Sequence, residues 1–184
     1  YKGKESQISK IQDAQVYFQK LFAECDVNAI ILKKSSGKGG SSIFKVDKKS
    51  IQKDLNKIGS SLFNEDYIFQ EMAMNHALIS NIYPSSLNTI RIDMCRGIRG
   101  NLELLGAVMR FGSGGSFMDN RSQGGFCVPV HSERGVLTGQ GFSQMKKGGK
   151  LPTEHPDSNF VFKGYEIPFF EQALGLAQKL SDLL

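Results

Sequence analysis

The sequence predicts an α+β protein with two lobes, a small one over residues 1–68 and a larger one over residues 69–184. Three observations support this fold class. Apolar residues recur at helical spacing near the N-terminus, and a Gly/Ser-rich stretch then separates two short apolar runs. From residue 88 onward, runs of alternating apolar and polar residues dominate. An early mixture of helices and strands followed by mostly strands is typical of the α+β class.

The elements of the first lobe follow from these patterns. Residues 7–24 carry apolar side chains on one helical face, and residues 28–33 (NAIILK) form a buried strand. Residues 43–46 are expected to return as a second strand. Residues 50–62 again show helical spacing, and residues 67–71 (YIFQE) are predicted to be a strand that leaves this lobe and enters the next.

The second lobe is predicted to be mainly antiparallel sheet. A short helix over 75–82 is stopped by Pro84. Residues 88–95 (NTIRIDMC) alternate as a half-buried strand does, and 102–111 return as its hairpin partner. The Gly-rich residues 112–125 form a long loop, and long ordered loops in compact domains are often functional. The remaining elements are a hairpin and a closing helix, over 126–130, 135–142 and 169–184.

Composition excludes several classes of protein. A hydrophobic share of 40% over 184 residues suits a globular chain and argues against disorder. The longest apolar runs are a few residues, far below the ~20 that cross a bilayer. The residues after Tyr1 do not have the pattern of a signal peptide, so none is expected there. The three Cys match neither a disulfide framework nor a zinc site, so a reducing cytoplasm is the expected compartment. The three His share no metal-ligand spacing, and we predict no metal ligand in the chain.

The net charge of +5 is divided unevenly along the chain. All 12 basic residues within residues 1–70 are Lys, whereas all six Arg lie between Arg91 and Arg134. Arg offers a planar fork for carboxylate or phosphate, and Lys a flexible point charge. Most of the Lys are expected to be solvated surface. The Arg that lie in strands beside Gly-rich segments are stronger candidates for a functional role.

The first candidate site is the Gly/Ser-rich stretch between two strands. Backbone N–H groups of such a turn can wrap phosphate oxygens, and Lys33 at the preceding strand end can add charge. A flexible hairpin tip is the alternative interpretation. The candidate residues of this stretch are Ser36, Gly37, Gly39, Gly40 and Ser41.

Two further candidates follow along the chain. The YIFQE strand can present its backbone, together with Glu71, to an adenine edge, the alternative being an exposed Glu at a strand end. Arg91 and Arg110 fall on paired strands beside the loop that holds Asp119 and Asn120. Two neighbouring arginines can hold an anion and stabilise charge that develops in phosphoryl or acyl-phosphate chemistry. Surface salt bridging is the alternative for these arginines.

Taken together, these segments resemble the ATP-grasp superfamily, and in particular its sugar-transfer-associated family, which is related to the α-L-glutamate ligase type. The segments appear in the order that the family shows and cover about residues 28–170. They are ILKKSSGKGGSSIF, YIFQE, HALISNIYPSSLNTIRID, LGAVMRFGSGGSFMDNRSQGGF and HPDSNFVFKGYEIPFF.

The resemblance implies an ATP site between two α+β lobes and a magnesium ion that bridges the phosphates. Lys33 would contact the nucleotide, residues 36–41 would cover its phosphates as a lid, and the strand ending in Gln70 and Glu71 would bind adenine. His76 is expected near the ribose. The residues expected to face the phosphate and acyl-phosphate side are Arg91, Arg110 and Asn120.

The implied activity is ligation: ATP phosphorylates a carboxylate, and an amine or similar nucleophile then displaces phosphate. Cell-surface polysaccharide or sugar-transfer metabolism is the expected setting. The family continues past residue 184 with an Asp-bearing strand and a Glu/Asn strand that hold magnesium, so we expect a chain truncated at both ends. The 184-residue piece is expected to bind ATP weakly without turnover.

Two other functions stay open at this point. One is a non-catalytic ATP-grasp-like binding or scaffold module in a polysaccharide-assembly system. The other is a basic polyanion-binding protein, which would bind any nucleic acid with a steep salt dependence. The sequence shows no basic run interleaved with aromatics, so no nucleic-acid partner is predicted.

Overall fold

The computed structural model describes residues 8–36, 42–181 and 183. The chain divides into two compact units, Tyr1–Ala73 and Met74–Leu184, which are taken in turn. Because β3 pairs with β1, residues 69–71 belong to the sheet of the first unit, whereas the sequence analysis places the lobe boundary before Phe69.

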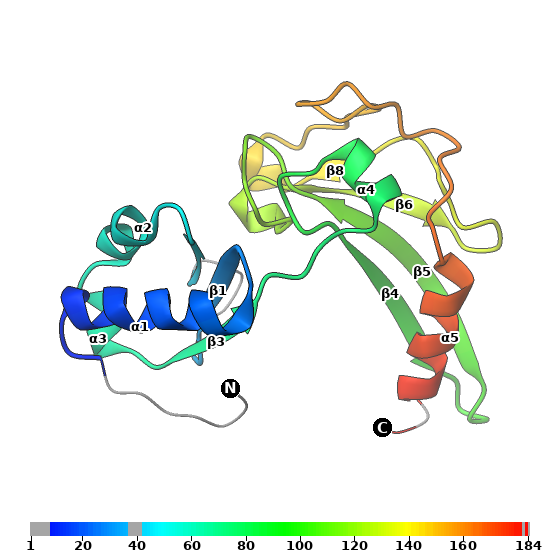
Figure 1. The fold of residues 1–184 in the computed structure, drawn as a ribbon. Helices are drawn as coiled ribbons and strands as arrows, with labels where there is room; N and C mark the ends of the chain where they lie inside the picture. The colour runs from blue at the N-terminus through cyan, green and yellow to red at the C-terminus, as the bar shows by residue number, and fades with distance from the viewer. Residues whose placement is uncertain (1–7, 37–41, 182, 184) are drawn as a thin grey trace. The chain divides into compact units, whose positions relative to one another are not determined.

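The first unit is a three-stranded antiparallel sheet with helices on one of its faces (Figure 1). The strand order is β2-β1-β3. Its elements are α1 (Ile11–Cys25), β1 (Ala29–Lys34), β2 (Ile43–Asp47), α2 (Ile51–Ile58), α3 (Ser61–Asn64) and β3 (Tyr67–Glu71).

The core of the first unit lies between this sheet and its helices. Helix α1 buries the face that holds Phe18 and Phe22, as its helical spacing of apolar residues predicts. Leu32 of β1 and Leu55 of α2 are fully buried against the same cluster. Since side chains alternate along a strand, burying Leu32 turns its neighbour Lys33 to the opposite, open face of the sheet.

The second unit is built on an antiparallel sheet of five strands in the order β4-β5-β6-β7, with β8 also paired to β6. Strands β4 and β5 form a long hairpin (Figure 1). The elements are α4 (Ala77–Ile82), β4 (Thr89–Arg96), β5 (Leu102–Phe111), η1 (Arg121–Gln123), β6 (Phe126–His131), β7 (Val136–Leu137), β8 (Phe142–Ser143), η2 (Met145–Lys147) and α5 (Phe170–Ser181).

One face of this sheet carries the core of the second unit. Met109 and Phe111 of β5 pair with Val128 and Phe126 of β6, and all four side chains are buried. Phe162 packs on them, with its ring stacked 5.7 Å from that of Phe111. The residues between them in sequence, among them Arg110, therefore project from the opposite face.

The predicted α+β class is confirmed, and two local predictions are corrected. The predicted helix 50–62 is divided into α2 and α3 by Gly59, which adopts a positive φ of 61° that a helix cannot accommodate. The predicted strand 135–142 is two short strands, β7 and β8, with Gly139 between them at φ 112°. No helix among the described residues has the length and apolarity that a bilayer crossing requires.

Candidate functional site

The face of the first sheet opposite its helices carries a lysine set among apolar side chains. Cross-strand register pairs Lys33 with Ile43 and Ile68, and pairs Ile31 with Gln70, so these side chains share one face. Lys33 and Gln70 are exposed, and Ile68 is 53% exposed. Lys45 pairs with Ile31 and so shares this face, where it forms a salt bridge of 3.3 Å with Asp47. The open face therefore offers apolar side chains with an amide and with Lys33 as a cation outside that salt bridge, which is what a flat base with attached phosphates requires.

The neighbouring residues point away from that face. Lys34 lies on the helix side of the sheet and forms a salt bridge of 3.1 Å with Glu65. Glu71 pairs with Ile30, so its side chain leaves the sheet on the face opposite Gln70. Of the residues flanking the Gly-rich stretch, Ser36 is an exposed turn residue.

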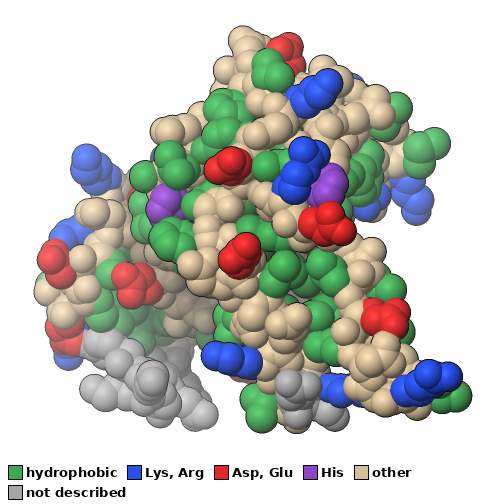
Figure 2. All heavy atoms as spheres, turned by 90° about the vertical axis from the view of Figure 1, so that its right-hand side faces the viewer, with side chains coloured by type: hydrophobic (Ala, Val, Ile, Leu, Met, Phe, Trp, Pro, Cys, Tyr) green, Lys and Arg blue, Asp and Glu red, His purple; other side chains and the backbone are tan. Residues whose placement is uncertain are grey.

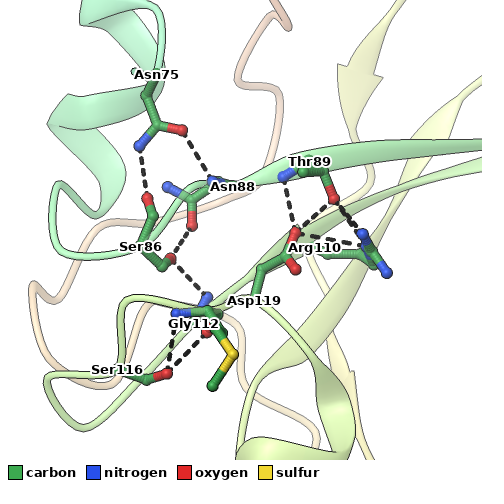
Figure 3. A network of polar contacts seen from close by, with 9 residues as sticks. Asn75, Ser86, Asn88, Thr89, Arg110, Gly112, Ser116 and Asp119 are labelled. Atoms are coloured by element: carbon green, nitrogen blue, oxygen red, sulfur yellow. Dashed lines mark hydrogen bonds and ion pairs between the residues drawn. The ribbon is translucent and has the colours of Figure 1, made fainter. Parts of the chain in front are cut away.

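In the second unit, Arg110 is held in place by a threonine and an aspartate (Figure 3). The Thr89 hydroxyl accepts hydrogen bonds from Nε and Nη2 of Arg110, with the Nε bond at 2.8 Å. The same hydroxyl donates to the carboxylate of Asp119, which also accepts from the Thr89 amide at 2.9 Å. Arg110 Nε lies 3.5 Å from Asp119 Oδ2, where the aspartate is nearly buried and the arginine side chain is 33% exposed.

A second layer of buried polar groups supports this arrangement (Figure 3). Ser86 donates to Asn88 and accepts from the backbone N–H of Gly112 at 3.1 Å. Asn75 donates to the Ser86 carbonyl and accepts from the Asn88 amide. These bonds tie the segment before β4 to the segment after β5, so Thr89 and Arg110 are fixed relative to each other.

The start of the Gly-rich loop is also held from the 153–170 segment. His155 is fully buried, and its Nε2 lies 3.0 Å from the Gly112 carbonyl oxygen. The amide of Asp157 donates to His155 Nδ1 at 3.2 Å, so the ring proton is on Nε2. Asp157 Oδ2 in turn accepts from the Gly114 amide at 2.7 Å, and the Tyr83 hydroxyl accepts from the Gly115 amide at 2.9 Å.

A second arginine lies on the same face as Arg110. Arg121 of η1 places its guanidinium 5.1 Å from the ring centre of Phe142, and its Nε is buried with no hydrogen-bond partner among the described residues. Burial raises the pKa of the Cys127 thiol, and the charges of Arg121 and Arg110 oppose that rise. Two guanidinium groups therefore flank Cys127, with Asp119 as the nearby carboxylate.

A small open pocket of about 190 Å³ lies in the second unit, at the N-terminus of α4. Exposed His76 caps α4 by accepting from the Leu78 amide at 3.3 Å, and its ring meets that of Phe169 edge-on at 5.4 Å. The lining of the pocket combines apolar and polar side chains. Its lining includes Ile79, Ile90, Met109, Ile167, Asn75, His76 and Asn88.

Comparison with known proteins decides the family. The profile described as sugar-transfer associated ATP-grasp matches residues 7–184, nearly the whole chain. The chain belongs to the sugar-transfer-associated ATP-grasp family. This membership confirms the resemblance drawn from the sequence. No curated protein and no solved structure matches the chain.

The structure of this ATP-grasp chain brings some of the predicted site residues together and separates others. Lys33 and Gln70 share the open face of the first sheet, while Glu71 leaves it on the other side. Arg91 lies on the same sheet face as Arg110 but is 65% exposed and pairs with Asp93 at 2.9 Å. Asn120 follows Asp119 as the residue that precedes η1, and its side chain is half-buried. Gly37, Gly39, Gly40 and Ser41 lie outside the described residues.

Sequence reasoning named Asp119 only as a member of the loop beside Arg110, and it missed Thr89 and His155, which complete the support of this arginine in the ATP-grasp chain. Thr89 and Asp119 are 30 positions apart, and His155 is 43 positions from Gly112. The local signal for Thr89 was its place at the start of an alternating strand opposite Arg110. Nothing local predicts that the HPDSN segment contacts the Gly-rich loop, because contacts at such separations depend on the tertiary fold.

ATP-grasp proteins in general bind ATP and magnesium. The cation and apolar surface around Lys33 suit a nucleotide, and the two guanidinium groups near Cys127 suit an anion. No group of three or more His, Cys, Asp or Glu that could hold a metal ion occurs in residues 8–36, 42–181 and 183.

The base of the Gly-rich loop is expected to tolerate no added side chain at Gly125. A Cβ there would lie 2.5 Å from the Asp119 carbonyl oxygen and 2.6 Å from that of Phe111. We expect Gly125→Ala to lower the free energy of unfolding by about 1–3 kcal/mol. Gly106→Ala, in β5, is the matched control because nothing lies within 4 Å of its Cβ position. Equal urea-denaturation midpoints for the two variants would contradict the expectation.

The stability of the second unit is expected to depend on pH through His155. Burial lowers the pKa of His155 below its ordinary 6.5, against the opposing effects of the Gly112 carbonyl and the Asp157 carboxylate. The other titratable group against the ring is Tyr83, stacked on it at 4.4 Å. As pH falls below 6.5, the unfolded chain takes up the proton first, so this contribution to stability declines until His155 protonates in the folded state.

We therefore expect the stability difference between the wild type and His155→Phe to shrink on going from pH 7.5 to pH 5. For one proton the slope is at most about 1.4 kcal/mol per pH unit. Urea denaturation of both proteins over this pH range checks the expectation. A difference that stays constant would show that His155 titrates alike in the folded and unfolded states.

Proposed function

We propose that the protein is an ATP-dependent ligase that activates a carboxylate as an acyl phosphate and joins it to an amine or similar nucleophile. Lys33 and the open face of the β2-β1-β3 sheet bind the nucleotide. Arg110, with Arg121 beside it, binds the anionic group that receives or leaves with phosphate. The acceptor belongs to cell-surface polysaccharide or sugar-transfer metabolism in the cytoplasm, in keeping with the family.

The observation that carries this proposal is the open face of the first sheet. A lysine with a purely structural role usually pairs with a carboxylate or lies on an edge strand. Here Lys33 stands on the central strand of three, between Ile43 and Ile68, and none of its contacts among the described residues is an ion pair. An exposed cation over apolar side chains provides both stacking surface and phosphate charge.

The proposed reaction has two steps. An oxygen of the carboxylate attacks the γ-phosphorus of ATP, and the bond from that phosphorus to the bridging oxygen of ADP breaks. The nucleophile then attacks the acyl carbon, and inorganic phosphate leaves with the electrons of the C–O bond. Arg110 stabilises the charge on the transferring phosphoryl oxygens, because Thr89 and Asp119 hold its guanidinium before the substrate arrives.

Calorimetry with Mg·ATP tests the proposal. We would measure binding to this chain and to a chain extended through the Asp and Glu/Asn strands expected after Leu184. Tight binding of ATP by the extended chain, with ADP release when carboxylates are supplied, is the expected result. If the extended chain binds ATP without turnover, the non-catalytic scaffold function takes its place. If neither chain binds an adenine nucleotide, ATP binding itself is wrong.

A polyanion-binding function predicts a different result and a different surface. On the face drawn in Figure 2, blue and red side chains are interspersed and form no single-sign patch. A polyanion binder would retain single-stranded DNA with an affinity that falls steeply with salt. We expect the protein to prefer ATP over a DNA oligonucleotide at 150 mM salt. At this ionic strength the Debye length is about 8 Å, and exposed charges further apart than that are largely screened.

A further inference from the structure

We propose that His155 is a positioning residue for Arg110, because it holds the start of the Gly-rich loop whose Asp119 orients the guanidinium. This inference rests on the role proposed above for Arg110. It assigns a task to the HPDSN segment, which begins 30 positions after the end of the loop along the chain and carries no candidate ligand of its own.

The first step is the set of contacts that His155 makes with Tyr83, Gly112 and Asp157, which we call the clamp. His155 is fully buried and stacks on Tyr83, with ring planes 21° apart and centres at 4.4 Å. Its two nitrogens serve two different backbone groups, the Gly112 carbonyl and the Asp157 amide. Stacking fixes the plane of the ring, and the two hydrogen bonds fix its rotation. Position 155 therefore requires a flat ring with a hydrogen-bond donor at one edge and an acceptor at the other, which neutral histidine provides.

The second step is the loop. Gly112 comes two residues after Arg110, and its amide is held by Ser86 while its carbonyl is held by His155. Asp157 and Tyr83 accept from the amides of Gly114 and Gly115. These four side chains fix the direction in which the chain leaves β5. No room exists for a Cβ at Gly112, where Met118 O and Ser86 Oγ would lie at 2.6 and 2.7 Å.

The third step is the placement of Asp119 beside Arg110 by the loop. The loop returns to its own start at Gly125, which is packed against the carbonyls of Asp119 and Phe111. The loop is therefore closed at its base, and a shift of Gly112 changes the place of Asp119. Asp119 is the only carboxylate among the described residues that pairs with Arg110, and it reaches the arginine together with Thr89. Losing the clamp is expected to release this pair.

The test separates the hydrogen bonds of His155 from its volume. His155→Phe keeps an aromatic ring on Tyr83 and loses both bonds, whereas the Nε2 amide of His155→Gln can still donate to the Gly112 carbonyl. The reporters are the Thr89 amide, whose acceptor is Asp119, and the Nε–H of Arg110. Both are followed by NMR on the full chain, as hydrogen exchange and as chemical shift.

We expect His155→Phe to speed exchange of the Thr89 amide by about tenfold or more and to shift the Arg110 Nε–H signal. His155→Gln should stay within about threefold of the wild type. His131→Phe is the matched control, since His131 Nδ1 has no hydrogen-bond partner among the described residues. If His155→Phe does not fold, His155→Asn replaces it, because its Oδ1 can still accept from the Asp157 amide while the shorter side chain places no donor where Nε2 meets the Gly112 carbonyl.

Two outcomes would overturn the inference: wild-type protection of Thr89 in His155→Phe, or equal loss in the Phe and Gln variants, which would mean that packing alone matters. The NMR reporters need no nucleotide, so they stand apart from the proposed function. In the extended chain, ADP release from Mg·ATP should fall with His155→Phe and recover with His155→Gln. If the wild type releases no ADP while the NMR results hold, the ligase proposal fails and the positioning role of His155 remains.

Discussion

Arg110→Gln is expected to lower ATP-dependent turnover by about a hundredfold to a thousandfold, the loss typical of removing one preorganised group that stabilises developing charge. Thr89 and Asp119 orient the guanidinium before any substrate binds. Substrate binding therefore requires little further ordering of the Arg110 side chain. Glutamine keeps much of the length and polarity but neither the charge nor the fork. ADP release from Mg·ATP by the extended chain measures the effect.

Two further variants sharpen this prediction. Arg110→Lys keeps the charge without the fork, and should recover only part of the activity because lysine cannot donate from Nε and Nη2 positions to one hydroxyl. Arg99→Gln removes the same charge from the exposed turn of the β4–β5 hairpin and is the control. If the Arg99 and Arg110 variants lose activity equally, net charge rather than the held guanidinium would be responsible.

Lys33→Ala is expected to weaken Mg·ATP binding by about tenfold to a hundredfold. This range corresponds to one hydrogen bond to a charged group, worth about 1.5–3 kcal/mol. The effect should appear in the dissociation constant measured by calorimetry. It should be larger for ATP than for adenosine, because a lysine on the open face acts on the phosphates through its charge.

The neighbouring lysine provides an internal control for this experiment. Lys34 has the same charge one residue further along β1, but it lies on the helix side of the sheet and pairs with Glu65. Lys34→Ala should leave the ATP affinity within about twofold and cost at most about 1 kcal/mol of stability. Equal losses of affinity in both variants would mean that the two lysines act only through the net charge of the protein. That result would contradict the proposal that the open face binds the nucleotide.

Much of the fold could be predicted because periodicity follows burial directly. The apolar positions of α1 and the alternation along β4 each reflect a single core face, so the elements fall close to the predicted ranges. The boundaries that failed lie at glycines. Gly59 ends α2 and Gly139 separates β7 from β8, each at a positive φ that the hydrophobic pattern does not record.

The candidate site was harder to predict, because it depends on register and on distant contacts. Gln70 and Glu71 are adjacent in sequence, and only the register of β3 against β1 decides which of them lies on the same sheet face as Lys33. The arginines show the same limit. Arg91 and Arg110 share a sheet face, yet Asp93 lies two residues from Arg91, while the carboxylate partner of Arg110 comes from the middle of the Gly-rich loop.

The alternation of lysines along β1 constrains how this region can change in evolution. Inserting or deleting one residue between Ile30 and Lys33 would exchange the two lysines, sending the cation of the open face into the salt bridge with Glu65. Substitutions that preserve length carry no such penalty. We therefore expect related chains to keep the number of residues in β1 constant.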